Sequence, residues 1–167
     1  MPASDLYAMF KPSPLGRSEI GPHHSAEGFF GLAGSYLKAA DVANVQGPAL
    51  TAPALSCLGQ ALELLLKAYL LAAGVGEKEL SRLPYSHDLL ACLQEAERRG
   101  LYGRFSETES QEFLKFGQLY ATKELHYLYE YAKSMPDFFV VRGIANRIQE
   151  YVFAYLSKSY FDAQKAD

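Results

Sequence analysis

The sequence predicts an all-α protein, an up-and-down bundle of about five helices. Apolar residues recur at three- and four-residue steps in several segments, and glycine or proline separates these segments. No run of alternating apolar and polar residues between turn residues is present, although such runs are typical of strands. Residues 54–73 are apolar over most of a helical circumference, which is expected of a helix at the centre of a bundle.

The segment before the first expected helix differs in composition from the rest of the chain. It contains Pro2, Pro12, Pro14 and Pro22 among scattered glycine and serine residues. Such a composition favours irregular backbone, so residues 1–26 are predicted to be an N-terminal arm. The bundle is predicted to cover residues 27–162, and residues 163–167 are predicted to be a C-terminal tail.

The first helix is expected at 27–46, because a broad apolar face recurs there and Gly47-Pro48 follows it. The central helix comes next, and Thr51 is a suitable N-cap for it. Its four polar side chains follow one another at spacings of four, three and four, on one narrow stripe: Ser56, Gln60, Glu63 and Lys67. Glu63 and Lys67 form a favourable i,i+4 pair.

A loop is expected at 74–85, where two glycines and Pro84 occur. A third helix is predicted at 87–99 with Ser86 as its N-cap. Ser106 and Glu109 have the spacing of a capping box and open a helix that reaches Tyr120, with a kinked continuation to residue 131. The last helix is expected at 139–161, after the break at Pro136.

Charge and cysteine content exclude several classes of function. The formal net charge is −3, which gives no electrostatic basis for strong, sequence-independent binding to nucleic acid. The two cysteines lie in apolar helical patterns, as expected of buried thiols in a reducing compartment. The chain begins without a basic segment and apolar run typical of a signal peptide, and Glu63 and Lys67 interrupt its longest apolar stretch. We therefore expect a cytoplasmic protein that does not enter a membrane.

Two pieces of the sequence resemble the HEPN domain family. The first is Ala61-Leu62-Glu63-Leu64-Leu65-Leu66-Lys67-Ala68-Tyr69-Leu70, similar to the family pattern A-x-E-x-x-L-K-A-x-L. The second is Ser86-His87-Asp88-Leu89-Leu90 after a glycine-containing loop, similar to the family's T/G-H-D/N-L helix start. The resemblance covers residues 27–160. It implies a HEPN-like bundle of four or five helices that forms a homodimer.

Catalytic HEPN members carry an arginine followed four to six residues later by histidine, usually at the start of the last helix. Such chemistry needs a general acid or base for the RNA 2′-hydroxyl and a fixed cation for the phosphate. Arg142 and Asn146 stand where this motif is expected, but no histidine follows them. Arg82 and His87 match the spacing literally, in the loop before the third helix. Arg82, His87 and Arg142 are therefore the candidate catalytic residues.

The candidate ligand-binding residues are Glu63, Lys67, His87 and Tyr127. Glu63 and Lys67 form either a buried polar site between helices or, in the preferred interpretation, a surface or interface ion pair. His87 either binds a ligand or bonds locally at the helix start. Tyr127 belongs to a tyrosine-rich segment that suits either base stacking or helix packing.

No cofactor or metal site is predicted. Phosphate-binding glycine motifs are absent from the sequence, and neither histidines nor cysteines have a metal-ligand spacing.

The resemblance implies a HEPN-like binding module for RNA, a nucleotide or a partner protein, within a toxin–antitoxin or defence system and without RNase activity. A nucleotidyltransferase-type protein would be its partner in a toxin–antitoxin pair. Two alternatives stay open. One is a metal-independent HEPN-type endoribonuclease with a composite site at a dimer interface. The other is a purely structural helical scaffold that dimerises.

Overall fold

A computed structural model describes residues 25–46, 51–101, 105–123, 125 and 135–164. These residues form six helices and no strand, which confirms the all-α prediction for this part of the chain. The helices are α2 (Ala26–Val45), α3 (Thr51–Ala72), α4 (Glu77–Leu80), α5 (Leu89–Arg98), α6 (Glu107–Ala121) and α7 (Phe138–Gln164). Most of the expected arm at residues 1–26 and of the expected tail at 163–167 lies outside the described residues. Residue 26 belongs to α2, with residue 25 as its N-cap, and residues 163–164 belong to α7.

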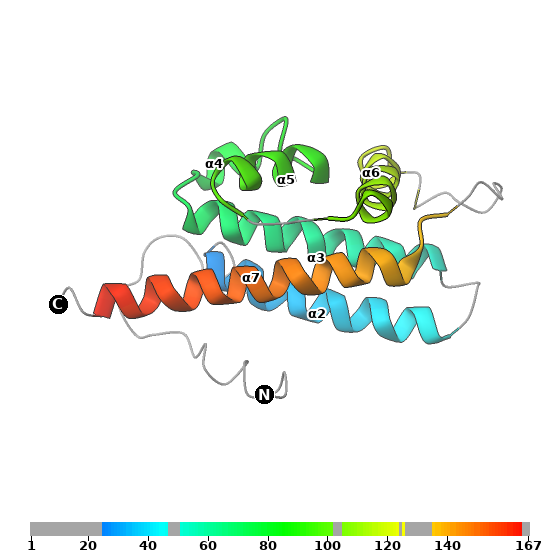
Figure 1. Cartoon of the computed structure of the whole chain (residues 1–167), viewed down its shortest axis with the longest axis horizontal. Coiled ribbons are helices and arrows are strands. Elements are labelled where there is room, and N and C mark those ends of the chain that lie inside the picture. Colours follow the sequence, from blue (N-terminus) through cyan, green and yellow to red (C-terminus); the bar gives the residue numbers. More distant parts are fainter. Residues whose placement is uncertain (1–24, 47–50, 102–104, 124, 126–134, 165–167) are drawn as a thin grey trace.

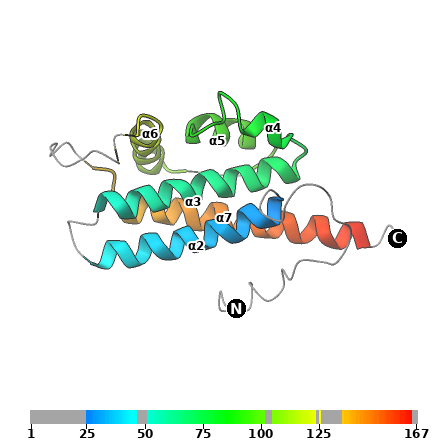
Figure 2. The same ribbon diagram turned by 180° about the vertical axis from the view of Figure 1, so that it is seen from behind.

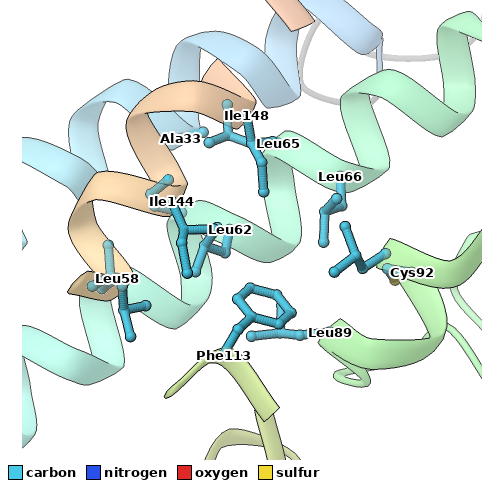
Figure 3. Packing of buried hydrophobic residues seen from close by; sticks show 14 of the residues in the cluster. Ala33, Leu58, Leu62, Leu65, Leu66, Leu89, Cys92, Phe113, Ile144 and Ile148 are labelled. Carbon is cyan, nitrogen blue, oxygen red and sulfur yellow. The ribbon is translucent and has the colours of Figure 1, made fainter. Parts of the chain in front are cut away.

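Helix α3 lies at the centre of the bundle, as its sequence predicts. It contacts α2 and α7 on one side and α5 and α6 on the other, and both views of the ribbon show these two layers (Figures 1 and 2). The close-up shows Leu62 and Leu65 near Ile144 and Ile148 of α7 (Figure 3). Burial of each such side chain contributes about 1.5–3 kcal/mol, and α3 supplies more buried apolar side chains than any other described helix.

Helix α3 also has the length and apolar composition of a membrane span. In its most apolar window, 67% of the helix is buried inside the bundle. Buried core helices can have the same length and apolar composition as membrane-spanning helices. These two properties therefore show only that α3 is the most apolar helix of the described residues.

Local side-chain chemistry fixes the N-terminal ends of several helices. Ser25 caps α2 by accepting a hydrogen bond from the Gly28 amide. Ser106 and Glu109 form the predicted capping box at α6. Asp137 Oδ1 accepts from the amides of Phe139 and Val140 at the start of α7. Each of these bonds satisfies an amide that the helix itself leaves unpaired.

Three predicted boundaries are wrong. The expected loop at 74–85 contains the one-turn helix α4. Thr51 is the first residue of α3 and not its cap. Helix α5 begins at Leu89, and its N-cap is Asp88, whose carboxylate accepts from the Ala91 amide at 2.9 Å. Ser86 therefore does not cap α5. The expected continuation of α6 through residues 126–131 lies outside the described residues.

The ends of α3 and α5 are tied together near α7. Tyr69 donates to the Arg99 carbonyl oxygen, and Arg99 Nη1 donates to the Ala73 carbonyl oxygen. Tyr151 of α7 donates to the carbonyl oxygen of Gly100, the residue after the α5 C-cap. Glu95 accepts from Arg98 and Arg99, and these hydrogen bonds lower its pKa to about 2. This network holds the C-terminal end of α5 against the end of α3 and against α7.

Candidate functional site

The carboxylate of Glu63 is the centre of a polar cluster inside the bundle. Glu63 lies in the middle of α3 and is 5% exposed. Its Oε1 accepts from Lys67 Nζ at 2.6 Å, one turn along the same helix. Its Oε2 accepts from the Tyr120 hydroxyl at 2.7 Å and lies 3.1 Å from His87 Nδ1. Residues from α3, α6 and the segment before α5 therefore meet at one side chain.

The preferred interpretation of Glu63 and Lys67 as a surface or interface ion pair is therefore wrong. Tyr120 of α6 and His87, just before α5, lie against Glu63, and the Lys67 and Glu63 side chains are only 13% and 6% exposed. The pair therefore belongs to a buried polar site, the alternative that the sequence left open. A buried charge is tolerated only when it is paired and hydrogen-bonded. Both carboxylate oxygens of Glu63 meet that requirement.

The electrostatics of the cluster keep Glu63 ionised. Burial by itself would raise the pKa of Glu63, but the hydrogen bonds from Lys67 and Tyr120 and the charge of Lys67 outweigh burial, and the pKa is lowered. Burial and the nearby carboxylate raise the pKa of Tyr120, so its hydroxyl stays a proton donor. The cluster thus combines a fixed anion with donors at three positions.

His87 is the member of the cluster that reaches solvent. Its side chain is 52% exposed, and its backbone has a φ of 61°, in the left-handed region that few non-glycine residues adopt. Because an ionised carboxylate only accepts, Nδ1 must be the donor to Glu63. In the neutral ring Nε2 then carries the lone pair, and Nε2 has no hydrogen-bond partner among the described residues. The interpretation of His87 as bonding only locally is wrong.

Two further hydrogen bonds hold the loop that carries His87. The Tyr85 carbonyl oxygen accepts from Cys92 Sγ at 3.4 Å, and the Ser86 amide donates to the Arg82 carbonyl oxygen at 3.1 Å. Burial raises the pKa of Cys92 to about 12, so this thiol stays protonated and unreactive. The guanidinium of Arg82 is exposed and forms no hydrogen bond or ion pair with a residue in the described ranges. Arg82 and His87 therefore share a loop, but their side chains form no hydrogen bond with each other.

Arg142 lies in a different part of the molecule. Its Nε and Nη2 donate to the two carboxylate oxygens of Asp41 at 2.8 and 2.9 Å, and its Nη1 donates to Asn146. These contacts join α7 to α2, whereas the Glu63 cluster joins α3 to α6 and to the segment before α5. The structure therefore does not bring Arg142 together with Arg82 or His87. Tyr127 lies outside the described residues.

Sequence reasoning missed Tyr120 as a member of the site and Asp41 as the partner of Arg142. Tyr120 lies 57 residues along the chain from Glu63, and Asp41 lies 101 residues from Arg142. No local spacing connects residues at such separations. Only the packing of α6 on α3 and of α2 on α7 reveals these pairs.

The lowered pKa of Glu63 predicts a pH dependence of stability. In the unfolded chain Glu63 takes up a proton near its ordinary pKa of about 4.3, while the folded protein still resists protonation. Stability from Glu63 is therefore present above that pH and is lost as the pH falls through the lower, folded pKa. We expect urea unfolding of Glu63→Gln between pH 5 and 3 to depend less on pH than that of the native chain. If the free energy of unfolding changes equally with pH in the two proteins, the pKa of Glu63 is not lowered by folding.

The chemistry open to the cluster is hydrogen bonding and proton transfer. No group of three or more histidine, cysteine or acidic residues that could hold a metal ion occurs among the described residues. Lys67 and His87 can donate to a ligand, and the lone pair of His87 Nε2 can accept a proton. Comparisons with known protein families, curated proteins and solved structures find no match to this chain. The HEPN resemblance therefore rests on the sequence patterns described above.

Proposed function

We propose that this protein is a HEPN-like binding module whose ligand is an RNA or a nucleotide, bound at the surface around His87. The observation that supports this function is the hydrogen bond between the buried Glu63 carboxylate and His87 Nδ1. It fixes an exposed imidazole with Nε2 directed away from its protein partner. A preorganised side chain loses little freedom on binding, so it contributes more to affinity than a mobile one.

A phosphate-bearing ligand suits the groups around this surface. Lys67 is cationic and is hydrogen-bonded to Glu63. The guanidinium of Arg82, which has no hydrogen-bond or ion-pair partner among the described residues, belongs to the same loop as His87, five residues before it. Arginine and lysine are the usual phosphate partners. Because Glu63 neutralises Lys67, the site has little excess positive charge, which favours a small or terminal phosphate over a long polyanion.

The proposal places the protein among HEPN-like members without RNase activity. The support is the missing histidine after Arg142 and the ion pair of Arg142 with Asp41, which occupies the cation that the family's chemistry would use. By the same resemblance, the protein acts as a homodimer in a toxin–antitoxin or defence system, beside a nucleotidyltransferase-type partner, in the cytoplasm.

Ligand titration tests the binding function. We expect a nucleotide or a short RNA to raise the melting temperature, since a ligand at 100 times its Kd stabilises the folded state by about 2.7 kcal/mol. His87→Ala should weaken binding by about tenfold or more, equivalent to about 1.4 kcal/mol. Lys158→Ala, which removes an exposed charge from α7, is the control and should bind as the native chain does. If no nucleotide or RNA shifts the melting temperature, a purely structural scaffold is favoured instead.

A metal-independent RNase is the second candidate, and one observation favours it. A carboxylate that orients a histidine by Nδ1 leaves Nε2 ready to act as a general base. The left-handed backbone of His87 is the kind of strain found at functional sites. In this reaction Nε2 would take the proton of an RNA 2′-hydroxyl. The 2′-oxygen would attack phosphorus, and the 5′-oxygen would leave and take a proton from solvent.

Incubation with total RNA separates this candidate from binding alone. The native chain, His87→Ala and Arg142→Ala are compared at equal concentrations. If the native chain and Arg142→Ala cleave RNA and His87→Ala does not, the reaction at His87 is established. Equal turnover by all three would exclude it, because a contaminating nuclease survives both substitutions.

A further inference from the structure

The Nε2 atom of His87 decides which ligand atoms can bind beside the ring. Because Nδ1 donates to the ionised Glu63 carboxylate, Nε2 of the neutral ring has a lone pair and no proton. A phosphate oxygen also carries lone pairs, so a phosphate can contact Nε2 only when a proton lies between the two atoms. A hydroxyl or amino group of a ligand brings its own proton and needs none from solvent.

The polar groups around Nε2 favour a ligand rich in acceptors. The carboxylates are already occupied, since both oxygens of Glu63 have donors and Asp88 caps α5. The cations have donors to spare. Lys67 Nζ has three N–H groups, and it binds the same carboxylate as His87 Nδ1, so the ammonium and the ring are neighbours. The guanidinium of Arg82 is exposed on the loop of His87. A phosphate, which only accepts when it is fully ionised, matches this surplus of donors.

We propose that the ligand of the His87 surface places a phosphate oxygen at Nε2, and that this nitrogen takes up one proton from solvent when the ligand binds. In the complex the ring is an imidazolium. Its Nδ1–H donates to Glu63 and its Nε2–H donates to the phosphate, so the positive ring lies between two anions. The phosphate specificity rests on the proposed function and names the chemical group that the surface recognises.

Histidine is the side-chain type at this site that ordinarily changes charge between pH 5 and 8. The other titratable or charged groups around it, among the described residues, come from α3, α6, α5 and its own loop: Glu63, Lys67, Tyr120, Asp88, Cys92 and Arg82. The pKa of Glu63 is lowered, and burial raises the pKa values of Tyr120 and Cys92, so these three groups keep their charge state near neutral pH. A proton taken up there on binding is therefore assigned to His87 and the phosphate it contacts.

Nitrogen NMR of the histidine side chains tests this protonation directly. Ribose 5-phosphate is the probe, and ribose, which lacks the phosphate, is the matched control. At pH 8 the unliganded ring should have a protonated Nδ1 and an unprotonated Nε2. Saturating ribose 5-phosphate should convert the Nε2 signal to the protonated type, whereas ribose should leave it unchanged. His87→Gln identifies the signals of His87 among those of the four histidines.

Uptake of a proton also predicts how affinity depends on pH. The second pKa of a phosphate monoester is about 6, so the probe stays a dianion between pH 7 and 8.5. The complex then holds one proton more than the free partners, and affinity should fall by about tenfold per pH unit once the free ring is neutral. In His87→Gln an amide N–H replaces the ring and does not titrate. Its affinity for the probe should be the same at pH 7 and 8.5.

The outcomes separate the phosphate specificity from the binding function itself. An Nε2 that stays unprotonated with the probe, or that is already protonated at pH 8 without it, would overturn the phosphate assignment. If nucleotides or short RNA still raise the melting temperature in that case, the binding function stands. The ligand then presents a hydroxyl or amino group to Nε2, as the RNase candidate requires of the RNA 2′-hydroxyl. If the probe, nucleotides and RNA all fail to bind, both proposals are wrong.

Discussion

Replacing Glu63 with alanine is expected to lower the free energy of unfolding by about 3–5 kcal/mol, the usual cost of removing one partner of a buried ion pair. Lys67 would keep its charge at the bottom of the cluster without a counter-ion, and the Tyr120 hydroxyl would lose its acceptor. The half-exposed His87 can turn to water and contributes less to the loss. Urea unfolding followed by circular dichroism measures the effect.

Two further variants separate the charge of Glu63 from its shape. Glu63→Gln keeps the side-chain length and an acceptor for Tyr120 but removes the negative charge, so its loss should be smaller than that of alanine. In Lys67→Met the cation is absent, and adding Glu63→Gln to that background should cost less than it does in the native chain. If Glu63→Ala loses less than about 1 kcal/mol, as expected for exposed pairs, the cluster is not buried in solution.

Much of the fold could be predicted from the sequence because the signals are local. The apolar circumference of 54–73, the Ser106–Glu109 capping box and the break at Pro136 each act within a few residues. The α3 assignment therefore agrees with the structure within three residues at its start and one at its end. The same locality explains the error at α5. Ser86 and Asp88 are both suitable caps, and only the left-handed turn at His87 decides for Asp88.

The site could be predicted only in part. The i,i+4 spacing of Glu63 and Lys67 predicts their contact, and the structure confirms it. Whether their stripe faces water or other helices depends on where α5 and α6 pack, and that is a property of the whole chain. A narrow polar stripe on an apolar helix is typical of a surface-facing side, so the sequence favoured the wrong alternative. The partner from α6, Tyr120, has no sequence signal that relates it to Glu63.

Stability and the proposed function depend on the same residue in this protein. Burying a carboxylate inside a bundle costs desolvation free energy that an apolar residue of similar size would not cost. Such a group is expected where a site requires it. In this chain the carboxylate orients His87, and Lys67 and Tyr120 keep it ionised and fixed. A Glu63→Leu variant that folds stably but no longer binds the ligand would separate the two roles.

Replacing Gly59 with alanine is expected to destabilise the protein by about 3 kcal/mol, although alanine is the better helix former. Gly59 lies one turn before Glu63 on α3, and a Cβ there would overlap the ring of Tyr120 at Cδ2 and Cε2. The ring belongs to a buried residue, so it cannot move aside without disturbing α6. Overpacking costs about 1–3 kcal/mol, and a lost hydrogen bond to a charged group costs about 1.5–3 kcal/mol. The gain in helix propensity returns only about 1 kcal/mol.

The size of this effect depends on Tyr120, and that dependence provides the control. In a Tyr120→Ala background the clash is absent, so adding Gly59→Ala should be neutral or stabilising. Gly143→Ala, in α7 with open space at its Cβ, should raise the free energy of unfolding by about 0.5–1 kcal/mol. If Gly59→Ala behaves like Gly143→Ala, Tyr120 does not lie against α3 and cannot hold Glu63. Because Gly59 has no side chain, α6 can pack closely enough for the Tyr120 hydroxyl to reach the buried Glu63 carboxylate.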